Sequence, residues 1–206
     1  MNRSVIRVVK VGGSLLDLAD LADRIRRWLA VQTPAHHVLL VGGGPLVEQI
    51  RHWHASRPLS EIAAHWMCID AMTVTAHMLH DRLPEIALIE DDRLLCQRVG
   101  ERNCTIFGPA QWLRHGEPWI RGTRLPTSWD VTSDAIAGRL AIVLAADELV
   151  LLKSALPVES STTELTALAD AGYVDRMLPR LAGELPPYRL VNLRGALEEE
   201  MGPDLG

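Results

Sequence analysis

Residues 8–14 of the chain read Val8-Val9-Lys10-Val11-Gly12-Gly13-Ser14. The apolar, β-branched run from Val5 to Val11 predicts a buried strand that carries a single lysine. The two glycines and the serine predict a tight turn, and the periodic apolar segment after them predicts a helix. Glycines lack a Cβ atom, so their N–H groups can face an anion, and a helix N-terminus adds partial positive charge. The stretch therefore predicts a strand, a phosphate-sized turn and a helix.

A second stretch of the same kind lies downstream. The apolar run 37–41 is followed by Gly42-Gly43-Gly44-Pro45 and by another helical pattern. Proline is well suited to the first position of a helix. Two glycine turns at the ends of neighbouring strands would bring two anionic groups together. We therefore interpret the chain as a phosphoryl transferase.

The remaining segments alternate between strand-like and helix-like patterns. Ser60 is the expected N-cap of a long helix that ends near Leu83, before Pro84. Such alternation predicts right-handed βαβ crossovers: an α/β fold, a three-layer αβα sandwich with a mainly parallel open sheet. Ligands of such sheets bind beyond the carboxyl ends of the strands, where both glycine turns fall. Further strands are expected at residues 86–89, 103–107, 148–152 and 190–193.

Composition limits the class of protein. With 206 residues and 48% hydrophobic residues, we expect one domain over residues 1–206 with a sizeable core. The net charge of -5 disfavours a nucleic-acid partner. No stretch resembles a secretion signal or a membrane span, so we expect no membrane partner and a cytoplasmic protein. The odd set Cys68, Cys96 and Cys104 is typical of reduced, buried thiols.

Two common nucleotide signatures are missing from the sequence. It contains no G-x-x-x-x-G-K-[ST] loop, and neither glycine turn completes G-x-G-x-x-G. Its distinctive feature is a lysine two residues before Gly12-Gly13-Ser14. With that feature, residues 9–14, 41–44 and 130–137 resemble the three signatures of the amino acid kinase superfamily, which includes acetylglutamate, aspartate, uridylate and isopentenyl phosphate kinases.

Two finer features, residues 64–67 (Ala-His-Trp-Met) and 128–134 (Ser-Trp-Asp-Val-Thr-Ser-Asp), are similar to one short branch of that superfamily. It is the kinase of methanofuran-type cofactor synthesis, which phosphorylates (5-aminomethyl-furan-3-yl)methyl phosphate to its diphosphate. The resemblance implies ATP and Mg²⁺ as cofactors, a small phosphorylated acceptor and self-association. It also implies an acceptor-binding half at about 1–130 and a shortened nucleotide-binding half at about 131–206.

The resemblance implies three catalytic residues. Lys10 would neutralise charge on the transferring phosphoryl group, which suits a reaction that depends on positioning and charge stabilisation. Asp134 would orient Lys10 and lie near Mg²⁺. Arg180 stands where family members often carry a late lysine that touches the transferring phosphate. Arginine also binds phosphate, but with fixed fork geometry.

The resemblance also implies binding residues. Gly12, Gly13 and Ser14 would hold the β/γ end of ATP, with Lys153 nearby, although a lysine at a strand end usually faces solvent. The acceptor's phosphate or carboxylate would lie at the second turn, beside a long helix that carries the rest of the set. The acceptor residues expected are Gly42, Gly43, Gly44, His65, Trp66 and Asp70.

Other readings stay open at this point. His65 and Trp66 could be a half-buried helix pair, and Arg114, Arg121 and Arg124 could be surface charges. A metal held by His77 and His80 lacks a complete ligand set, so no metal-ligating residue is expected. The acceptor could instead be isopentenyl phosphate, a nucleoside monophosphate or an amino-acid carboxylate. A non-catalytic nucleotide- or oxyanion-binding module is the alternative outside the enzymes.

Overall fold

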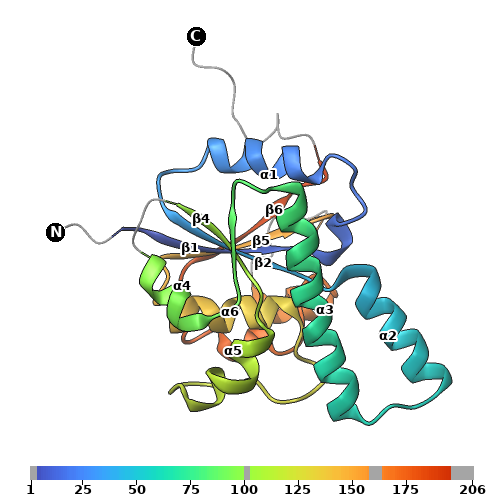
Figure 1. Ribbon diagram of the computed structural model, residues 1–206. Helices are drawn as coiled ribbons and strands as arrows, with labels where there is room; N and C mark the ends of the chain where they lie inside the picture. Colours follow the sequence, from blue (N-terminus) through green and yellow to red (C-terminus); the bar gives the residue numbers. More distant parts are fainter. Residues whose placement is uncertain (1–3, 100–102, 158–163, 196–206) are drawn as a thin grey trace.

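The computed structural model describes residues 4–99, 103–157 and 164–195, which fold around one parallel sheet (Figure 1). Its strand order is β3-β4-β2-β1-β5-β6, and every neighbouring pair is parallel. The expected mainly parallel sheet is confirmed. The strands are β1 (Ile6–Val11), β2 (His36–Val41), β3 (Ala87–Ile89), β4 (Cys104–Phe107), β5 (Glu148–Lys153) and β6 (Tyr188–Asn192).

Helices connect the strands. Ser60 caps the long α3, because its hydroxyl accepts a hydrogen bond from the Ala63 N–H at 3.2 Å, as predicted. No helix within the described residues has the length and apolar composition needed to span a bilayer. The α-helices are α1 (Leu21–Ala30), α2 (Gly44–Ser56), α3 (Glu61–Arg82), α4 (Asp92–Arg98), α5 (Ala110–His115), α6 (Ser133–Val143) and α7 (Leu165–Asp170). Short 3₁₀ turns are η1 (Gly13–Leu15), η2 (Glu117–Trp119) and η3 (Leu178–Leu181).

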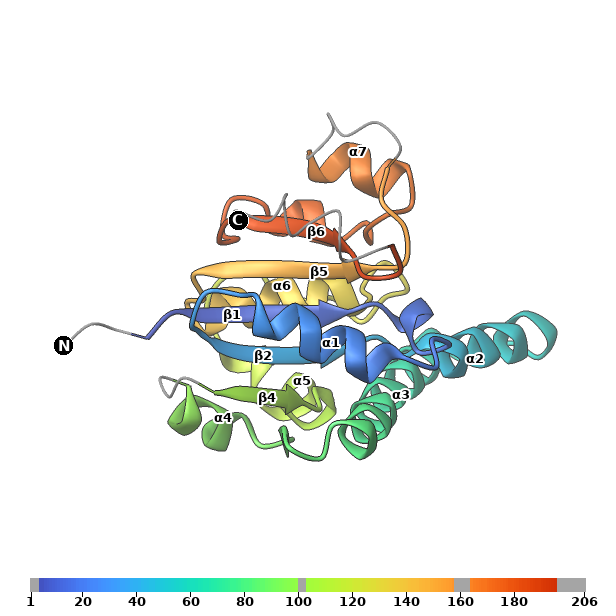
Figure 2. The ribbon, with the colours of Figure 1, turned by 90° about the horizontal axis from the view of Figure 1, so that it is seen from above.

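The molecule has three layers, which confirms the αβα sandwich (Figures 1 and 2). Successive strand residues point to opposite faces, so each central strand contributes to both halves of the core. Val8 packs with the apolar face of α6, whereas Val9 and Val11 pack with α1. The central strand β1 is buried along its whole length. Any polar side chain on it must therefore find a partner inside the protein.

The segment after the first glycine turn differs from the prediction. The sequence pattern predicted a helix at once, but the chain forms only the η1 turn, and α1 begins at Leu21. Leu15 packs into the core beside the sheet, and Leu16 reaches Gly44 of the second turn. With both contacts made, the backbone after Leu15 does not continue as a helix until Leu21. The first turn therefore lacks the long helix expected behind it.

The thiols also differ from expectation. Cys96 is exposed, and Cys68 and Cys104 are half-buried, so the prediction of three buried thiols was wrong.

Candidate active site

The two glycine turns lie in direct contact at the carboxyl ends of β1 and β2. These strands pair in parallel with Val11 opposite Val41, and the Gly42 N–H donates to the Val11 carbonyl at 2.9 Å. A Cβ atom on Gly13 would lie 2.5 Å from the Gly44 nitrogen, far inside van der Waals contact. The turns can approach this closely only because both lack side chains.

An open cleft of about 950 Å³ lies above the turns. Its walls are formed by residues of both turns, of α2 and α3, of the segment that leads into α6, of the end of β5 and of the segment 172–175. Sites for small molecules and cofactors reach volumes of about 1,000 Å³. The cleft therefore has room for a nucleotide and a small second substrate.

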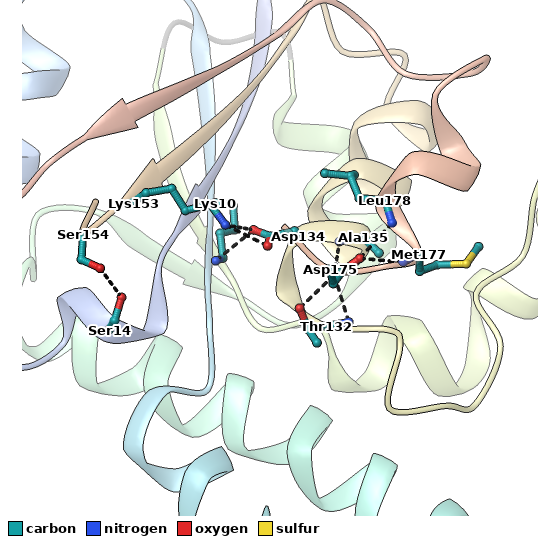
Figure 3. A network of polar contacts seen from close by, with 10 residues as sticks. All are labelled: Lys10, Ser14, Thr132, Asp134, Ala135, Lys153, Ser154, Asp175, Met177 and Leu178. Atoms are coloured by element: carbon teal, nitrogen blue, oxygen red, sulfur yellow. Dashed lines mark hydrogen bonds and ion pairs between the residues drawn. The ribbon is translucent and has the colours of Figure 1, made fainter. Parts of the chain in front are cut away.

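Three charged side chains lie together in this cleft (Figure 3). The Lys10 Nζ atom lies 3.0 Å from Asp134 Oδ1, and the Lys153 Nζ atom donates to both Asp134 oxygens at 2.8 Å. The side chains of Lys10 and Asp134 are only 7% and 6% exposed. One carboxylate thus faces two ammonium groups, which leaves a net positive charge of the kind that binds phosphate.

Strand alternation explains this meeting. Lys10 follows Val8 by two residues, and Lys153 follows Leu151 by two, so both lysines point to the face covered by α6. Strands β1 and β5 are neighbours, and Asp134 lies in the first turn of α6. The sheet register and the start of one helix therefore assemble the group.

Burial and charge act in opposite directions on these groups. Burial opposes the charge of Asp134, but Lys10 and Lys153 outweigh it and hold the pKa of this carboxyl below its usual value. Burial, and then the nearby Lys10 charge, lower the pKa of Lys153 to about 8. Lys153 is thus a cation at neutral pH, close to the pH at which it loses its proton.

The interpretation of Lys153 as a mostly solvent-facing lysine was wrong, because its side chain is only 11% exposed. The composition of the chain already sets this residue apart. Among the 21 lysine and arginine residues of the chain, lysine stands at two positions only, Lys10 and Lys153. Both contact Asp134. A lysine is a compact point charge on a flexible stem, whereas arginine has a rigid fork. All the other residues of this set are arginines, so the two lysines of the chain both lie in this cleft.

The first glycine turn also differs in detail from its expected role. The Gly12 N–H already donates to the Leu152 carbonyl at 2.9 Å, so it does not point at a ligand. Gly12 instead serves by lacking a side chain, since a Cβ atom there would lie 2.9 Å from that oxygen. Ser14 lines the cleft, and its hydroxyl lies 2.9 Å from the Ser154 hydroxyl. The amides of Gly13 and Ser14 begin η1 and lack a partner within that turn.

Arg180 does not reach the site. It lies exposed in η3 and does not line the cleft, so the structure does not bring it to the place expected for a catalytic residue. Its neighbours Leu178 and Leu181 are fully buried beneath α6, and this directs Arg180 outward. The same segment instead places Asp175 in the cleft.

The side chains expected along α3 lie beside the cleft instead of in it. His65 and Trp66 line a separate hollow of about 70 Å³, and the His65 Nδ1 atom lies 3.2 Å from the Ser128 carbonyl oxygen. Asp70 pairs with the Arg114 guanidinium through two hydrogen bonds of 2.7 and 2.8 Å. That guanidinium also lies 4.6 Å from the ring centre of Trp66. None of these three side chains lines the cleft. Arg121 and Arg124 are exposed, as a surface role predicts.

Among the residues that the structure describes, the side chains of the cleft form no ligand set for Mg²⁺. Within the described ranges, no group of three or more histidine, cysteine or carboxylate side chains is placed to hold a metal. Both oxygens of Asp134 already accept from lysine. His77 instead pairs with Glu90 at 2.8 Å, and His80 contacts the Ile86 carbonyl oxygen at 2.8 Å.

Anion binding is expected to weaken as the pH rises through about 8. Lys153 loses its charge in that range, because its pKa lies near 8 in the folded protein. If only the charged form binds, the dissociation constant rises about tenfold between pH 7 and 9. Calorimetric titration with inorganic sulfate, which does not itself titrate there, measures this change.

Lys153→Arg is the matched control, because a guanidinium stays charged throughout this range. The variant should bind sulfate with little pH dependence. The same pH dependence in both proteins would contradict a role for Lys153 in anion binding.

Sequence comparison finds no family model and no curated protein that matches the chain. Comparison of structures does find matches. The uridylate kinase of Archaeoglobus fulgidus superposes with a TM-score of 0.63 and 18% identity, covering 95% of this chain and 93% of that one. The UMP kinase of Bacillus anthracis gives a TM-score of 0.66 and 12% identity over 97% and 92% of the chains.

A third match extends the comparison to another acceptor. The carbamate kinase of Giardia lamblia, in a structure bound to AMP-PNP, gives a TM-score of 0.56 and 16% identity over 98% and 97% of the chains. All three similarities cover more than nine-tenths of both partners. Two kinds of kinase thus superpose on this chain along almost its whole length. The chain therefore has the amino acid kinase-like fold that these kinases share.

Proposed function

We propose that the protein is an ATP-dependent kinase that transfers the γ-phosphoryl group to a small phosphate monoester. One observation carries the proposal. Two glycine turns touch each other at adjoining strand ends, and the Lys10–Asp134–Lys153 group lies in the same cleft. Bringing two anionic substrates together needs two anion sites and a cation between them.

The two lysines would act on the transferring group. An acceptor phosphate oxygen attacks the γ-phosphorus in line, and the bond from that phosphorus to the β–γ bridging oxygen breaks as ADP leaves. Negative charge on the phosphoryl oxygens is then stabilised by the ammonium groups of Lys10 and Lys153, which Asp134 holds in place. Gly13, Ser14 and Ser154 would hold the β/γ end of ATP. Mg²⁺ would enter with the nucleotide.

The acceptor phosphate would bind at the start of α2. This helix has 13 residues, and its N-cap residue Gly43 has no side chain that could accept a hydrogen bond from the first turn. The first N–H groups of a helix have no partner within it, and the helix dipole favours an anion there. Gly43, Gly44 and Pro45 all line the cleft. The second turn therefore combines open space with uncapped backbone donors.

We propose (5-aminomethyl-furan-3-yl)methyl phosphate as the acceptor, giving the diphosphate in methanofuran-type cofactor biosynthesis. The two stretches that resemble this branch contact each other through His65 and Ser128, so they form one local unit beside the acceptor side of the cleft. Trp129 and Met72 line that side and could contact a flat ring. Glu48 also lines it, and its carboxylate is proposed to contact the substrate's ammonium group in place of Asp70. One Glu48 oxygen accepts from the Arg51 guanidinium at 2.6 Å, so the substrate would share this carboxylate with Arg51.

Phosphorylation of candidate acceptors tests this proposal. The purified protein with ATP and Mg²⁺ should form a diphosphate from the furan compound, detected by ³¹P NMR. The comparison set is isopentenyl phosphate, UMP, carbamate and acetylglutamate, of which UMP is favoured by the matched uridylate kinases. Turnover of one of these, without turnover of the furan compound, would replace the acceptor.

Binding without turnover would change the class of function. AMP-PNP that binds tightly, while no acceptor is phosphorylated, would favour a nucleotide-binding module over an enzyme. A homo-oligomer in the cytoplasm belongs to the same proposal, and light scattering after size exclusion measures the number of subunits.

A further inference from the structure

Asp175 joins two walls of the cleft through a single carboxylate (Figure 3). Its Oδ2 atom accepts from the Thr132 N–H at 3.1 Å, the Thr132 hydroxyl at 2.8 Å and the Ala135 N–H at 2.8 Å. Its Oδ1 atom accepts from the Met177 and Leu178 N–H groups at 3.2 and 2.8 Å. Five donors from two separate segments thus converge on one side chain.

The first of these segments carries Asp134. Thr132 is the N-cap residue of α6, but its side chain does not cap the helix. Its hydroxyl donates to Asp175 instead, and Asp175 accepts the helix N–H of Ala135 that an N-cap side chain would normally accept. Asp134 lies between these two anchored residues. Asp175 therefore fixes the backbone from which the Asp134 carboxylate reaches the two lysines.

The second segment forms an adjoining part of the cleft wall. Met177 and Leu178 begin η3, and the Leu178 side chain packs so close to α6 that a Cβ atom on Gly138 would lie 2.8 Å from it. The residues just before, Gly172 to Asp175, line the cleft. One carboxylate thus ties this wall to the start of α6.

Stability of the helix does not require this arrangement. Threonine is itself a good N-cap residue, and its own hydroxyl could accept the N–H group of Ala135. Instead a second carboxylate is held near Asp134, although burial and the Asp134 charge raise the pKa of Asp175 to about 6. Such a costly placement is expected where a charged side chain must hold a particular geometry.

We propose that Asp175 is a positioning residue for the phosphoryl transfer proposed above. Its carboxylate sets the orientation of the α6 first turn and, through Asp134, the positions of the Lys10 and Lys153 ammonium groups. This inference rests on the proposed function for its catalytic consequence. The arrangement of the two lysines can be measured without any turnover.

The two lysines provide a direct spectroscopic readout. Because lysine occurs only at positions 10 and 153, protein labelled with ¹⁵N at the lysine side chains gives one ammonium signal for each. Lys10→Arg assigns the signals. In Asp175→Asn, the amide has a single acceptor oxygen, so its NH₂ group must face one of the two sets of donors. We expect both lysine signals to shift, the pKa of Lys153 to fall as Asp134 moves away from it, and kcat to fall at least tenfold.

Two further variants separate position from charge. Asp175→Glu keeps the charge but lengthens the side chain, so positioning predicts shifted signals and lower kcat here too, whereas a pure charge effect predicts wild-type behaviour. Thr132→Val removes one donor and should give a smaller change in the same direction, which keeps the test open if Asp175→Asn does not fold. Asp170→Asn is the matched control, because Asp170 is exposed at the end of α7.

The outcomes are distinct. Folded Asp175→Asn and Asp175→Glu proteins with wild-type lysine signals and wild-type kcat would overturn the positioning role. A wild-type protein that phosphorylates no acceptor would overturn the proposed function, while the lysine signals would still decide how Asp175 acts on the cleft.

Discussion

Lys10→Met is expected to lower the rate of phosphoryl transfer by about 10³-fold, the loss found when one preorganised charge donor is removed from a transition state. The Lys10 ammonium lies buried beside Asp134 in the cleft. A water molecule in its place would carry no charge and could not stabilise the transferring group to the same extent. Methionine has nearly the same length and suits the buried strand β1. Asp134 keeps Lys153 as a partner, so the fold should remain. Initial rates at saturating ATP, with thermal unfolding followed by circular dichroism, measure both effects.

Arg180→Met is the matched comparison. The resemblance placed Arg180 on the transferring phosphate, whereas the structure places it on the exposed side of η3. The variant should therefore keep the wild-type rate. A loss like that of Lys10→Met would restore Arg180 to the site, and an unchanged rate in Lys10→Met would remove the proposed mechanism.

Gly13→Ala is expected to damage both the fold and the site. The added Cβ atom would lie 2.5 Å from the Gly44 nitrogen and 2.7 Å from its Cα atom, so backbone has to move. Overpacking of this kind costs about 3 kcal/mol. In a chain of this length that corresponds to a melting temperature lower by roughly 6–12 °C. Because the two turns would separate, binding of AMP-PNP should also be lost.

Gly183→Ala provides the control for this change. A Cβ atom at Gly183 would have no heavy atom within 4 Å, apart from its chain neighbours. Its melting temperature and its binding of AMP-PNP should match those of the wild type. If Gly13→Ala behaved in the same way, the close contact between the two turns would not be a requirement of the site.

The sequence predicted the parts of the site that follow from local order. Strand β1 with Lys10, the two glycine turns and the helix that carries Asp134 each have a pattern within ten residues. Strand alternation then determines which face receives Lys10. The sheet order places both turns at the same edge, as expected for parallel strands.

The errors concern side chains whose partners lie far away in the chain. Asp175 bonds to residues some 40 positions earlier, and nothing in its own segment predicts that contact. Arg180 was placed by position in a motif, but the burial of its leucine neighbours decides its direction. Asp70 was predicted to contact a ligand, but its carboxylate accepts two hydrogen bonds from Arg114 of a different helix. Pattern indicates an element, whereas packing between elements decides where a charge points.

The confinement of lysine to the cleft has a practical consequence. Acylating reagents and aldehydes attack primary amines, and the side chains of this protein offer only the two that contact Asp134. Apart from the α-amino group, coupling through amines would therefore occur in the cleft and not on the outer surface. Labels and surface attachment for this protein are better directed at Cys96, whose thiol is exposed.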